Sequence, residues 1–310
     1  MPTVRELLKQ ALKKCILRAY PSFGSNRLIS TKIGNHVIRI PARNPLSRHY
    51  QWRPLTQSCL RCLVQAMRAH FDDFSAVDIG ANVGDTLAII KSGADIPVIC
   101  VEGDSACIGI LKRNIGQFSR VSLIEAYLGE ESGEELVHVR NETWNATLTP
   151  GRGTGARKIH FETIDRVLPT VPGWEKTKII KVDCEGFDLR ILRGGGKVIA
   201  ELSPVLVFEY NQYNLPNAGD VGLEFFPWLT AQGYDDCFIF DADGSFILQC
   251  SASDRRLLRD LDRYISAAGN PLSYLDIVAF PGSLKPVAGT YRDICAELSL
   301  SSPRAWNSAL

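Results

Sequence analysis

The chain has 310 residues, 45% of them apolar, and its 35 basic and 34 acidic residues leave a net charge of +1. A chain of this size buries a large core, and one enlarged α/β domain with terminal additions is more economical than two full domains. The balanced charge gives no sign of a nucleic-acid-binding surface. No apolar run reaches the ~18 residues of a membrane span, and the N-terminus lacks a signal-peptide segment, so a cytoplasmic protein is expected.

Residues 1–70 are predicted to form an extension outside the main domain. An amphipathic basic helix is expected over residues 4–19, followed by a strand at 36–40, a polar connection at 46–53 and a helix at 55–70. The basic helix suits peripheral contact with an anionic membrane surface, and a lid or dimer arm with a solvated basic face explains its pattern equally well. The pattern does not distinguish a monomer from an oligomer.

The nine cysteines are odd in number and have no regular framework, which is typical of reduced thiols in a cytosolic protein. Cys59 and Cys62 form a Cys-x-x-Cys pair inside the predicted helix at 55–70. Because no second Cys or His pair stands at zinc-ligand spacing, we expect these thiols to pack in the core and predict no metal site.

Strands and helices alternate over residues 71–283, which indicates a doubly wound, mostly parallel seven-stranded α/β sheet with helices on both faces. Strands are expected at 74–79, 97–102, 121–126, 179–183, 205–210, 234–240 and 273–280, with helices at 84–92, 104–117 and 221–231. Two further strands, 136–140 and 158–162, flank a polar excursion over 141–157 that is either a substrate lid or a surface hairpin. No element is predicted after Pro281, and residues 284–310 are treated as a tail.

The segment from Val77 to Thr86 is the most informative part of the chain, because it reads as a buried strand, a glycine turn and the start of a helix. Gly80, Asn82 and Gly84 form a turn whose backbone amides would approach a nucleotide-like cofactor at the positive end of that helix. The alternative is an ordinary βα turn in which glycine only closes the chain and Asp78 caps a helix.

An acid at the end of the next apolar run supports the cofactor interpretation. Glu102 follows the first glycine by about 20 residues, as ribose recognition in βαβ folds requires, and Asp104, two residues further on, is expected to cap the next helix on the cofactor side. The turn lacks the third glycine of a dinucleotide site, and Asp78 would repel a pyrophosphate but attract an ammonium group. S-adenosylmethionine has an ammonium group, ribose hydroxyls and no phosphate, so it is the predicted cofactor.

A second block, from Lys178 to Gly195, contains Lys181-x-Asp183-x-Glu185-Gly186 and precedes a strand that ends in Glu209. With these residues, the glycine turn and Thr163-Ile164-Asp165, the chain resembles the FkbM family of S-adenosylmethionine-dependent methyltransferases over about residues 71–283. The resemblance implies a class I, Rossmann-like methyltransferase fold and O-methylation of a sugar, glycan or natural-product hydroxyl. The chain departs from many relatives at Gly103, where they have proline.

Four residues of this block are candidates for catalysis. Alternation along a strand places Lys181, Asp183 and Glu185 on one face, and active sites of open α/β sheets lie outside the carboxyl ends of the strands. Asp183 is the first candidate for the general base and Glu209 the second. Glu185 alternatively caps the helix that opens at Gly186, and Lys181 pairs with a carboxylate inside the sheet. A purely structural charge network is the competing interpretation, and the spacing demands no divalent metal.

Two other classes of protein remain open at this point. A nicotinamide-dependent oxidoreductase is disfavoured by the missing glycine and by the second block. A non-catalytic, methyltransferase-like partner subunit would keep the fold and present an interface instead of a reaction.

Overall fold

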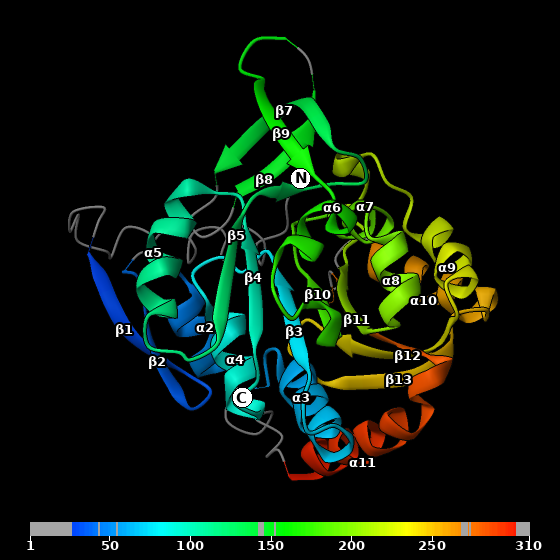
Figure 1. Cartoon of the computed structure of the whole chain (residues 1–310). Helices are drawn as coiled ribbons and strands as arrows, with labels where there is room; N and C mark the ends of the chain where they lie inside the picture. Colours follow the sequence, from blue (N-terminus) through cyan, green and yellow to red (C-terminus); the bar gives the residue numbers. More distant parts are fainter. Residues whose placement is uncertain are drawn as a thin grey trace, which may run out of the picture.

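The computed structural model describes residues 27–42, 44–53, 55–141, 146–151, 153–267, 272 and 274–301. These residues form one large sheet with helices on both faces, a smaller sheet above one end of its strands, and a two-stranded hairpin at its side (Figure 1). The basic helix expected over residues 4–19 lies outside the described residues.

The large sheet has eight strands in the order β13-β12-β14-β11-β10-β3-β4-β5. They are β3 (Ser75–Ile79), β4 (Val98–Glu102), β5 (Val121–Glu125), β10 (Thr177–Val182), β11 (Val205–Tyr210), β12 (Tyr234–Asp241), β13 (Phe246–Ser251) and β14 (Leu275–Pro281). Neighbours from β11 to β5 are parallel, and β14 runs antiparallel between β11 and β12. The doubly wound, mostly parallel α/β fold is confirmed.

Strand β13 is an eighth strand beside the seven that the sequence predicts. It stands at the edge of the sheet, its residues are mostly half-exposed, and it pairs antiparallel with β12. The apolar signal of such an edge strand is weak, because its conformation depends on pairing with a neighbour more than on its own residues.

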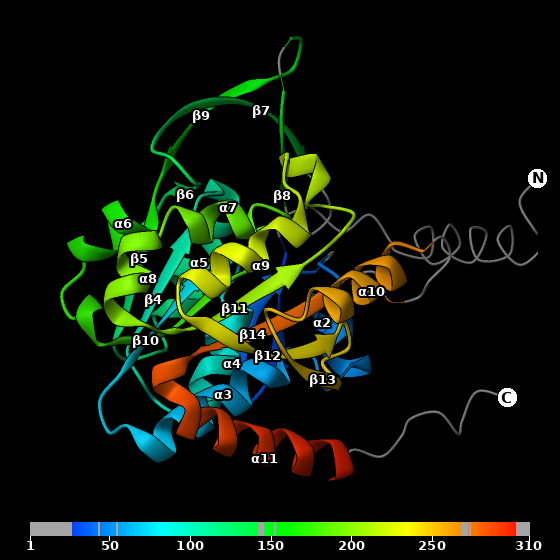
Figure 2. The ribbon, with the colours of Figure 1, turned by 90° about the vertical axis from the view of Figure 1, so that its right-hand side faces the viewer.

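Alternate residues of the central strands face two apolar cores, one on each side of the sheet. In β3, Ala76 belongs to the first core and Val77 to the second. The first core is covered by α3 (Ser58–His70), α4 (Asp85–Gly93), α5 (Ser105–Ile115) and α11 (Lys285–Ser301), and the second by α7 (Asp188–Arg193), α8 (Gly196–Leu202), α9 (Gly222–Ala231) and α10 (Arg255–Ser266), as Figure 2 shows. The sheet is therefore buried on both faces, as parallel strands require.

The remaining elements are shorter. The hairpin consists of β1 (Leu28–Ile33) and β2 (His36–Pro41) and packs on the first core. The others are α2 (Leu46–Trp52), α6 (Ile164–Val167) and the 3-10 turns η1 (Leu168–Thr170), η2 (Trp174–Lys176), η3 (Pro216–Ala218) and η4 (Gly282–Leu284).

Two helices occur where the sequence predicts none. Residues 46–53 were expected to be a polar connection but contain α2, which follows Pro45 without a side-chain cap and so lacks a local start signal. Helix α11 occupies the segment after Pro281, for which no element was expected. Both helices take their stability from packing on other parts of the chain rather than from local signals.

Helix α11 is packed against α3 in the first core. The Tyr291 hydroxyl donates a hydrogen bond of 3.2 Å to the Cys59 carbonyl, and Cys59 and Cys62 are buried there as free thiols. The boundaries expected at residues 70 and 284 thus fall between elements that share one core.

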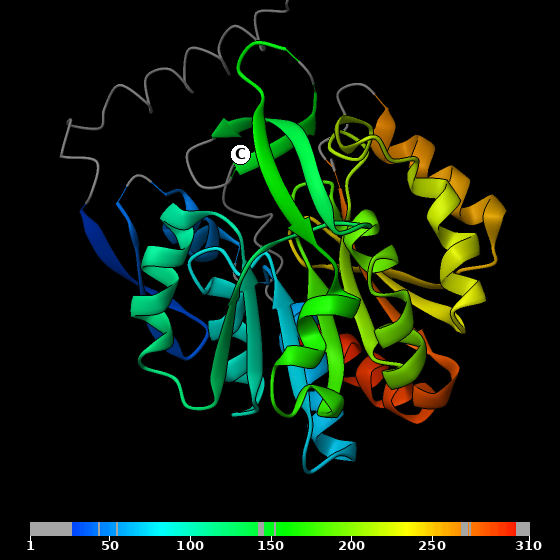
Figure 3. The ribbon, with the colours of Figure 1, turned by 45° about the horizontal axis from the view of Figure 1, so that its top comes forward.

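The smaller sheet has four strands in the order β6-β9-β7-β8. They are β6 (Tyr127–Leu128), β7 (Gly133–Asn141), β8 (Ala146–Pro150) and β9 (Arg157–Glu162). The strands expected at 136–140 and 158–162 lie within β7 and β9, and the excursion between them contributes β8. This sheet lies above the carboxyl ends of the central strands (Figure 3). Within the described residues, no helix combines the length and apolarity needed to cross a membrane.

Candidate active site

A cavity of about 570 Å³ lies between the carboxyl ends of β3, β4, β10 and β11 and the overlying strand β8. One end is formed by the glycine turn after β3 and by the end of β4, and the other by the loop that follows β11. Ligand sites of open α/β sheets occupy this position, and their volumes usually fall between about 300 and 1,000 Å³.

The glycine turn can form only without side chains at two positions. Gly80 has φ +75°, and a Cβ there would overlap the backbone carbonyl oxygen of Asp183 on the neighbouring strand. Gly84 has φ +91° and stands directly before α4, where no side chain caps the helix. The turn therefore brings backbone to the cavity wall and leaves the N–H groups of the first turn of α4 without a side-chain acceptor.

Glu102 is held rigidly at the cofactor end of the cavity. Its Oε2 accepts a hydrogen bond of 2.8 Å from the N–H of Asn82, and its Oε1 accepts from Gly103 (3.0 Å) and Asp104 (2.8 Å). Burial raises the pKa of Glu102, and the three backbone donors act in the opposite direction. Because each carboxylate oxygen has two lone pairs and Oε2 accepts only one of these bonds, Oε2 can still accept a hydroxyl of a ligand.

Gly103 and Asp104, the two residues after Glu102, both line the cavity. The side chain of Asp104 accepts from the N–H groups of Ala106 (2.7 Å) and Cys107 (3.3 Å), so it caps α5 as expected while it also lines the cavity. A Cβ at Gly103 would lie 2.5 Å from the ring of Tyr127. Glycine at this position therefore leaves room for that ring at the cavity wall.

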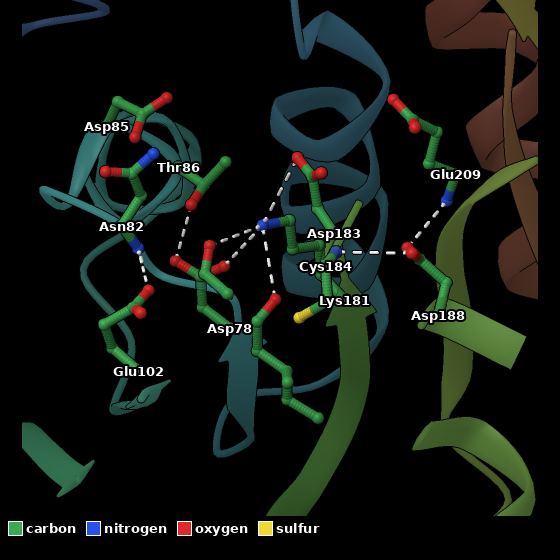
Figure 4. Close-up of polar contacts among 12 residues, drawn as sticks. Asp78, Asn82, Asp85, Thr86, Glu102, Lys181, Asp183, Cys184, Asp188 and Glu209 are labelled. Atoms are coloured by element: carbon green, nitrogen blue, oxygen red, sulfur yellow. Dashed lines mark hydrogen bonds and ion pairs between the residues drawn. The ribbon is translucent and has the colours of Figure 1, made fainter. Parts of the chain in front are cut away.

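Asp78 does not line the cavity, and its charge is already compensated. The side chain is fully buried, Lys181 Nζ lies 3.0 Å from its Oδ1, and the Thr86 hydroxyl donates a bond of 2.6 Å to its Oδ2 (Figure 4). Burial alone would lower the pKa of Lys181, but the charges of Asp78 and Asp183 raise it above its usual value. The structure thus places Asp78 against an internal ammonium group, not where it would meet an ammonium group of a ligand.

Asp183 stands between this internal pair and the cavity. Its Oδ2 lies 3.7 Å from Lys181 Nζ, and its side chain keeps 35% of its surface exposed (Figure 4). It follows the end of β10, next to the glycine turn after β3. Asp183 is therefore a carboxylate that an acceptor in the cavity can reach.

Glu209, at the end of β11, lines the same cavity but is in a different state. Its Oε1 accepts a bond of 2.9 Å from the amide of Asn211. Burial and the charge of Asp183 raise its pKa well above the usual range, with further contributions from neighbouring acids. Glu209 thus carries its proton under conditions in which an ordinary glutamate is ionised.

Two buried acids that the sequence analysis did not single out support this arrangement. Asp188 accepts from the N–H groups of Cys184 (3.3 Å), Gly186 (3.2 Å) and Glu209 (3.4 Å), so it joins the turn after β10 to β11. Asp276 on β14 lies opposite Glu209, and burial raises its pKa to about 8. An acid inside an otherwise apolar predicted strand is the signal that would have identified Asp276.

Glu185 binds a loop rather than a helix end. Its backbone has φ +52°, and its Oε2 accepts a bond of 2.9 Å from the amide of Asn214. Helix α7 follows Phe187 without a side-chain cap, so the expected capping role is not seen. Glu185 instead links the turn after β10 to the loop after β11.

Helix α2 adds a wall that the sequence analysis missed. The hydroxyl of Tyr50 donates a bond of 2.9 Å to Oδ2 of Asp85, the first residue of α4, and both residues line the cavity. Burial raises the pKa of Asp85 to about 6. The pair was missed because residues 46–53 carry no helical signal, although Asp85 itself belongs to the glycine segment.

A glycine turn, an acid at the end of the neighbouring strand and an accessible carboxylate meet at the carboxyl ends of the central strands, an arrangement that suits the class of S-adenosylmethionine-dependent methyltransferases. The family model for the methyltransferase FkbM domain matches residues 78–235, just over half of the chain. The chain belongs to the FkbM methyltransferase family, whose cofactor is S-adenosylmethionine.

Three solved structures are similar to the chain at low identity. The FkbM methyltransferase from Methylobacillus flagellatus KT is 16% identical with a TM-score of 0.41, over 67% of this chain and 44% of that chain. TYW2 from M. jannaschii, solved in complex with AdoMet, is 10% identical with a TM-score of 0.42, over 84% and 88% of the two chains. Precorrin-6y C5,15-methyltransferase from Geobacter metallireducens GS-15 is 13% identical with a TM-score of 0.36, over 71% and 86%.

The chain thus spans less than half the length of the first of these structures. Among curated proteins, none matches it.

Proposed function

We propose that the chain methylates a hydroxyl group of a sugar, glycan or natural product, with Asp183 as the general base. The observation that carries the proposal is the position of Asp183. It is a partly exposed carboxylate at the carboxyl edge of the sheet, beside the glycine turn and inside the cavity that also contains Glu102.

The cofactor fits the residues at one end of the cavity. Gly80 keeps the wall free of a side chain, and Glu102 presents an oriented carboxylate for the ribose hydroxyls. S-adenosylmethionine supplies an electrophilic methyl group when it is bound. The lack of a phosphate in this cofactor agrees with the acids around the turn, Asp85, Glu102 and Asp104.

The chemistry requires little beyond orientation and removal of one proton. Transfer to an alcohol is an in-line displacement, so most of the rate comes from holding the acceptor oxygen in line with the methyl group. As that oxygen displaces the sulfur from the methyl carbon, its proton passes to Asp183, because a carboxylate within hydrogen-bond reach can accept this proton. Lys181 keeps Asp183 and Asp78 in place from inside the sheet.

Glu209 has a different role from Asp183 in the proposed reaction. Because its raised pKa keeps it protonated, it donates a hydrogen bond to the acceptor instead of removing a proton. Glu185 positions Asn214 at the rim of the acceptor end of the cavity.

The proposal is tested by comparing metabolites from a strain without the gene, complemented with wild-type protein or with Asp183→Asn. Mass spectrometry should find hydroxyl-methylated products with the wild type and not with the variant. Calorimetry should find equal affinity of both proteins for S-adenosylhomocysteine. Methylated products made at wild-type levels by Asp183→Asn would refute the assignment of the base.

A further inference from the structure

The acceptor end of the cavity, away from Glu102, has a characteristic lining. It is formed by the ends of β10 and β11, the loop that runs from β11 into η3, and β8, which packs against η3. Its uncharged polar side chains include those of Thr147, Thr149, Asn211, Tyr213, Asn214 and Asn217, and Leu148, Cys184, Phe187 and Tyr274 line the cavity as well.

The charged groups of the cavity are almost all acids. Among the described residues these are Asp85, Glu102, Asp104, Asp183 and Glu185, with Lys181 as the one lysine or arginine, and Glu209 lines the same cavity with a raised pKa. Lys181 is 2% exposed and lies against Asp78, so its charge is used within the protein. Burial lowers the pKa of His49, the histidine of the lining, which favours its neutral form.

We propose that the group methylated in this cavity belongs to a neutral, polyhydroxylated ring such as an uncharged sugar unit, and that units carrying a carboxylate or phosphate are excluded. This inference rests on the proposed function and selects one acceptor class within it.

The exclusion of anions follows from the acids around the acceptor. An anionic group would enter beside the carboxylates of Asp183 and Glu185, and the described lining offers no cation that is free to pair with it. The acids already repel one another, because the charges of Asp183 and Glu185 contribute to the raised pKa of Glu209. A further negative charge beside these carboxylates is therefore unfavourable.

The preference for a hydroxylated ring follows from the uncharged side chains. Tyr213 lines the cavity with 74% of its surface exposed, so its ring offers a flat apolar face on which a sugar ring can stack. The Asn214 amide donates to Glu185 (2.9 Å) and the Asn217 amide to the Tyr213 carbonyl (3.0 Å), which fixes both groups. Each amide has an oxygen and a second N–H besides the one so used, and a ring hydroxyl both donates and accepts.

The test uses purified enzyme, S-adenosylmethionine with a tritiated methyl group, and a small-molecule extract of the source cells from which the gene has been deleted. Labelled products are hydrolysed with acid to their units, so that charge on a remote carrier does not count. The units then pass over an anion exchanger and a reversed-phase column. We expect the label in the unretained, hydrophilic fraction.

Label held by the anion exchanger would overturn the exclusion of anions, and label held by the reversed-phase column would overturn the sugar class. Calorimetry with S-adenosylhomocysteine separates these failures from failure of the proposed function. If it binds but no small molecule is labelled, both proposals fall. If it does not bind, the proposed function fails at the cofactor.

A matched pair of variants tests the ring of Tyr213. Tyr213→Ala should raise the KM for the labelled acceptor at least tenfold and leave the affinity for S-adenosylhomocysteine unchanged. Tyr264→Ala removes a similarly exposed tyrosine on α10, outside the cavity, and should change neither quantity. Equal acceptor KM values for the two variants would refute the stacking role.

Discussion

Three backbone N–H groups converge on Glu102, so the orientation of this carboxylate is fixed before a ligand arrives. Glu102→Ala should weaken binding of S-adenosylhomocysteine by about 1–3 kcal/mol, the usual cost of leaving buried polar partners unsatisfied. Calorimetry measures the change. Glu125→Ala is the control, because Glu125 lies beside Glu102 in register on β5, pairs with Lys112 and does not line the cavity. Binding of NADH in place of either S-adenosyl ligand would refute the cofactor assignment.

Burial and neighbouring acids raise the pKa of Glu209, and isosteric amide variants separate the roles of Asp183 and Glu209. Asp183→Asn should lower turnover by roughly 10²–10⁴-fold, the range typical of general-base loss. Glu209→Gln should cost much less, because glutamine still donates a hydrogen bond as the protonated acid does. Methyl transfer to the identified acceptor is the measurement. Near-full activity of Asp183→Asn combined with an inactive Glu209→Gln would exchange the two roles.

At the scale of elements, the sequence predicts the strands that lie in the middle of the sheet. β3, β4, β10 and β11 are buried on both faces, and mainly apolar residues mark β3, β4 and β11 locally, whereas Lys178 and Lys181 interrupt the apolar residues of β10. β13 and α2 were not predicted because their conformations depend on pairing or packing with segments elsewhere in the chain.

The same distinction applies to the site. Active sites of open α/β sheets lie at the carboxyl ends of the strands, and this rule locates Asp183 and Glu209 from the sequence. The structure brings both residues to the cavity. Asp78 was expected to face a ligand, but Lys181 on the neighbouring strand neutralises its charge. This ion pair depends on the register between β3 and β10, which neither segment reveals alone. The contact of Tyr50 with Asp85 likewise joins two distant segments.

Helix α2 can be tested through its one hydroxyl in the cavity wall. Tyr50→Phe removes the hydrogen bond to Asp85 and should lower the free energy of unfolding by about 0.5–1.5 kcal/mol. Urea denaturation measures the change. Trp52→Ala, in the same helix but 76% exposed, should alter stability by less than about 0.5 kcal/mol. An equal loss in both variants would show that α2 contributes by general packing and not through this bond.

For the whole molecule, the buried acids set the dependence of stability on pH. Burial raises the pKa of Asp276 to about 8 and that of Asp188 to about 7, whereas an unfolded aspartate titrates near 3.9. Between these values the folded chain binds more protons than the unfolded chain, so stability falls as pH rises. For each of these carboxyl groups, the free energy of unfolding falls by about 1.4 kcal/mol per pH unit until the pH passes the folded-state pKa.

Asp276→Asn replaces one of these carboxyl groups with an amide that does not titrate. Between about pH 5 and pH 7.5, its free energy of unfolding should fall less steeply than that of the wild type, by about 1.4 kcal/mol per pH unit. The variant should also be the more stable protein at pH 7.5. Urea denaturation at several pH values provides the comparison, with the exposed Asp260→Asn as the control that keeps the wild-type slope. Parallel curves for Asp276→Asn and wild type would show that Asp276 is ionised in the folded protein.

The packing of α3 on α11 has a consequence for how the protein is made. The bond between Tyr291 and Cys59 spans 232 positions, yet every described residue that lines the cavity precedes residue 275. A nascent chain therefore contains all the described lining residues of the cavity before the ribosome has added the helix that closes the first core. Until then the apolar side of α3 stays uncovered, and a premature stop just after Pro281 should yield an insoluble product that lacks none of those groups.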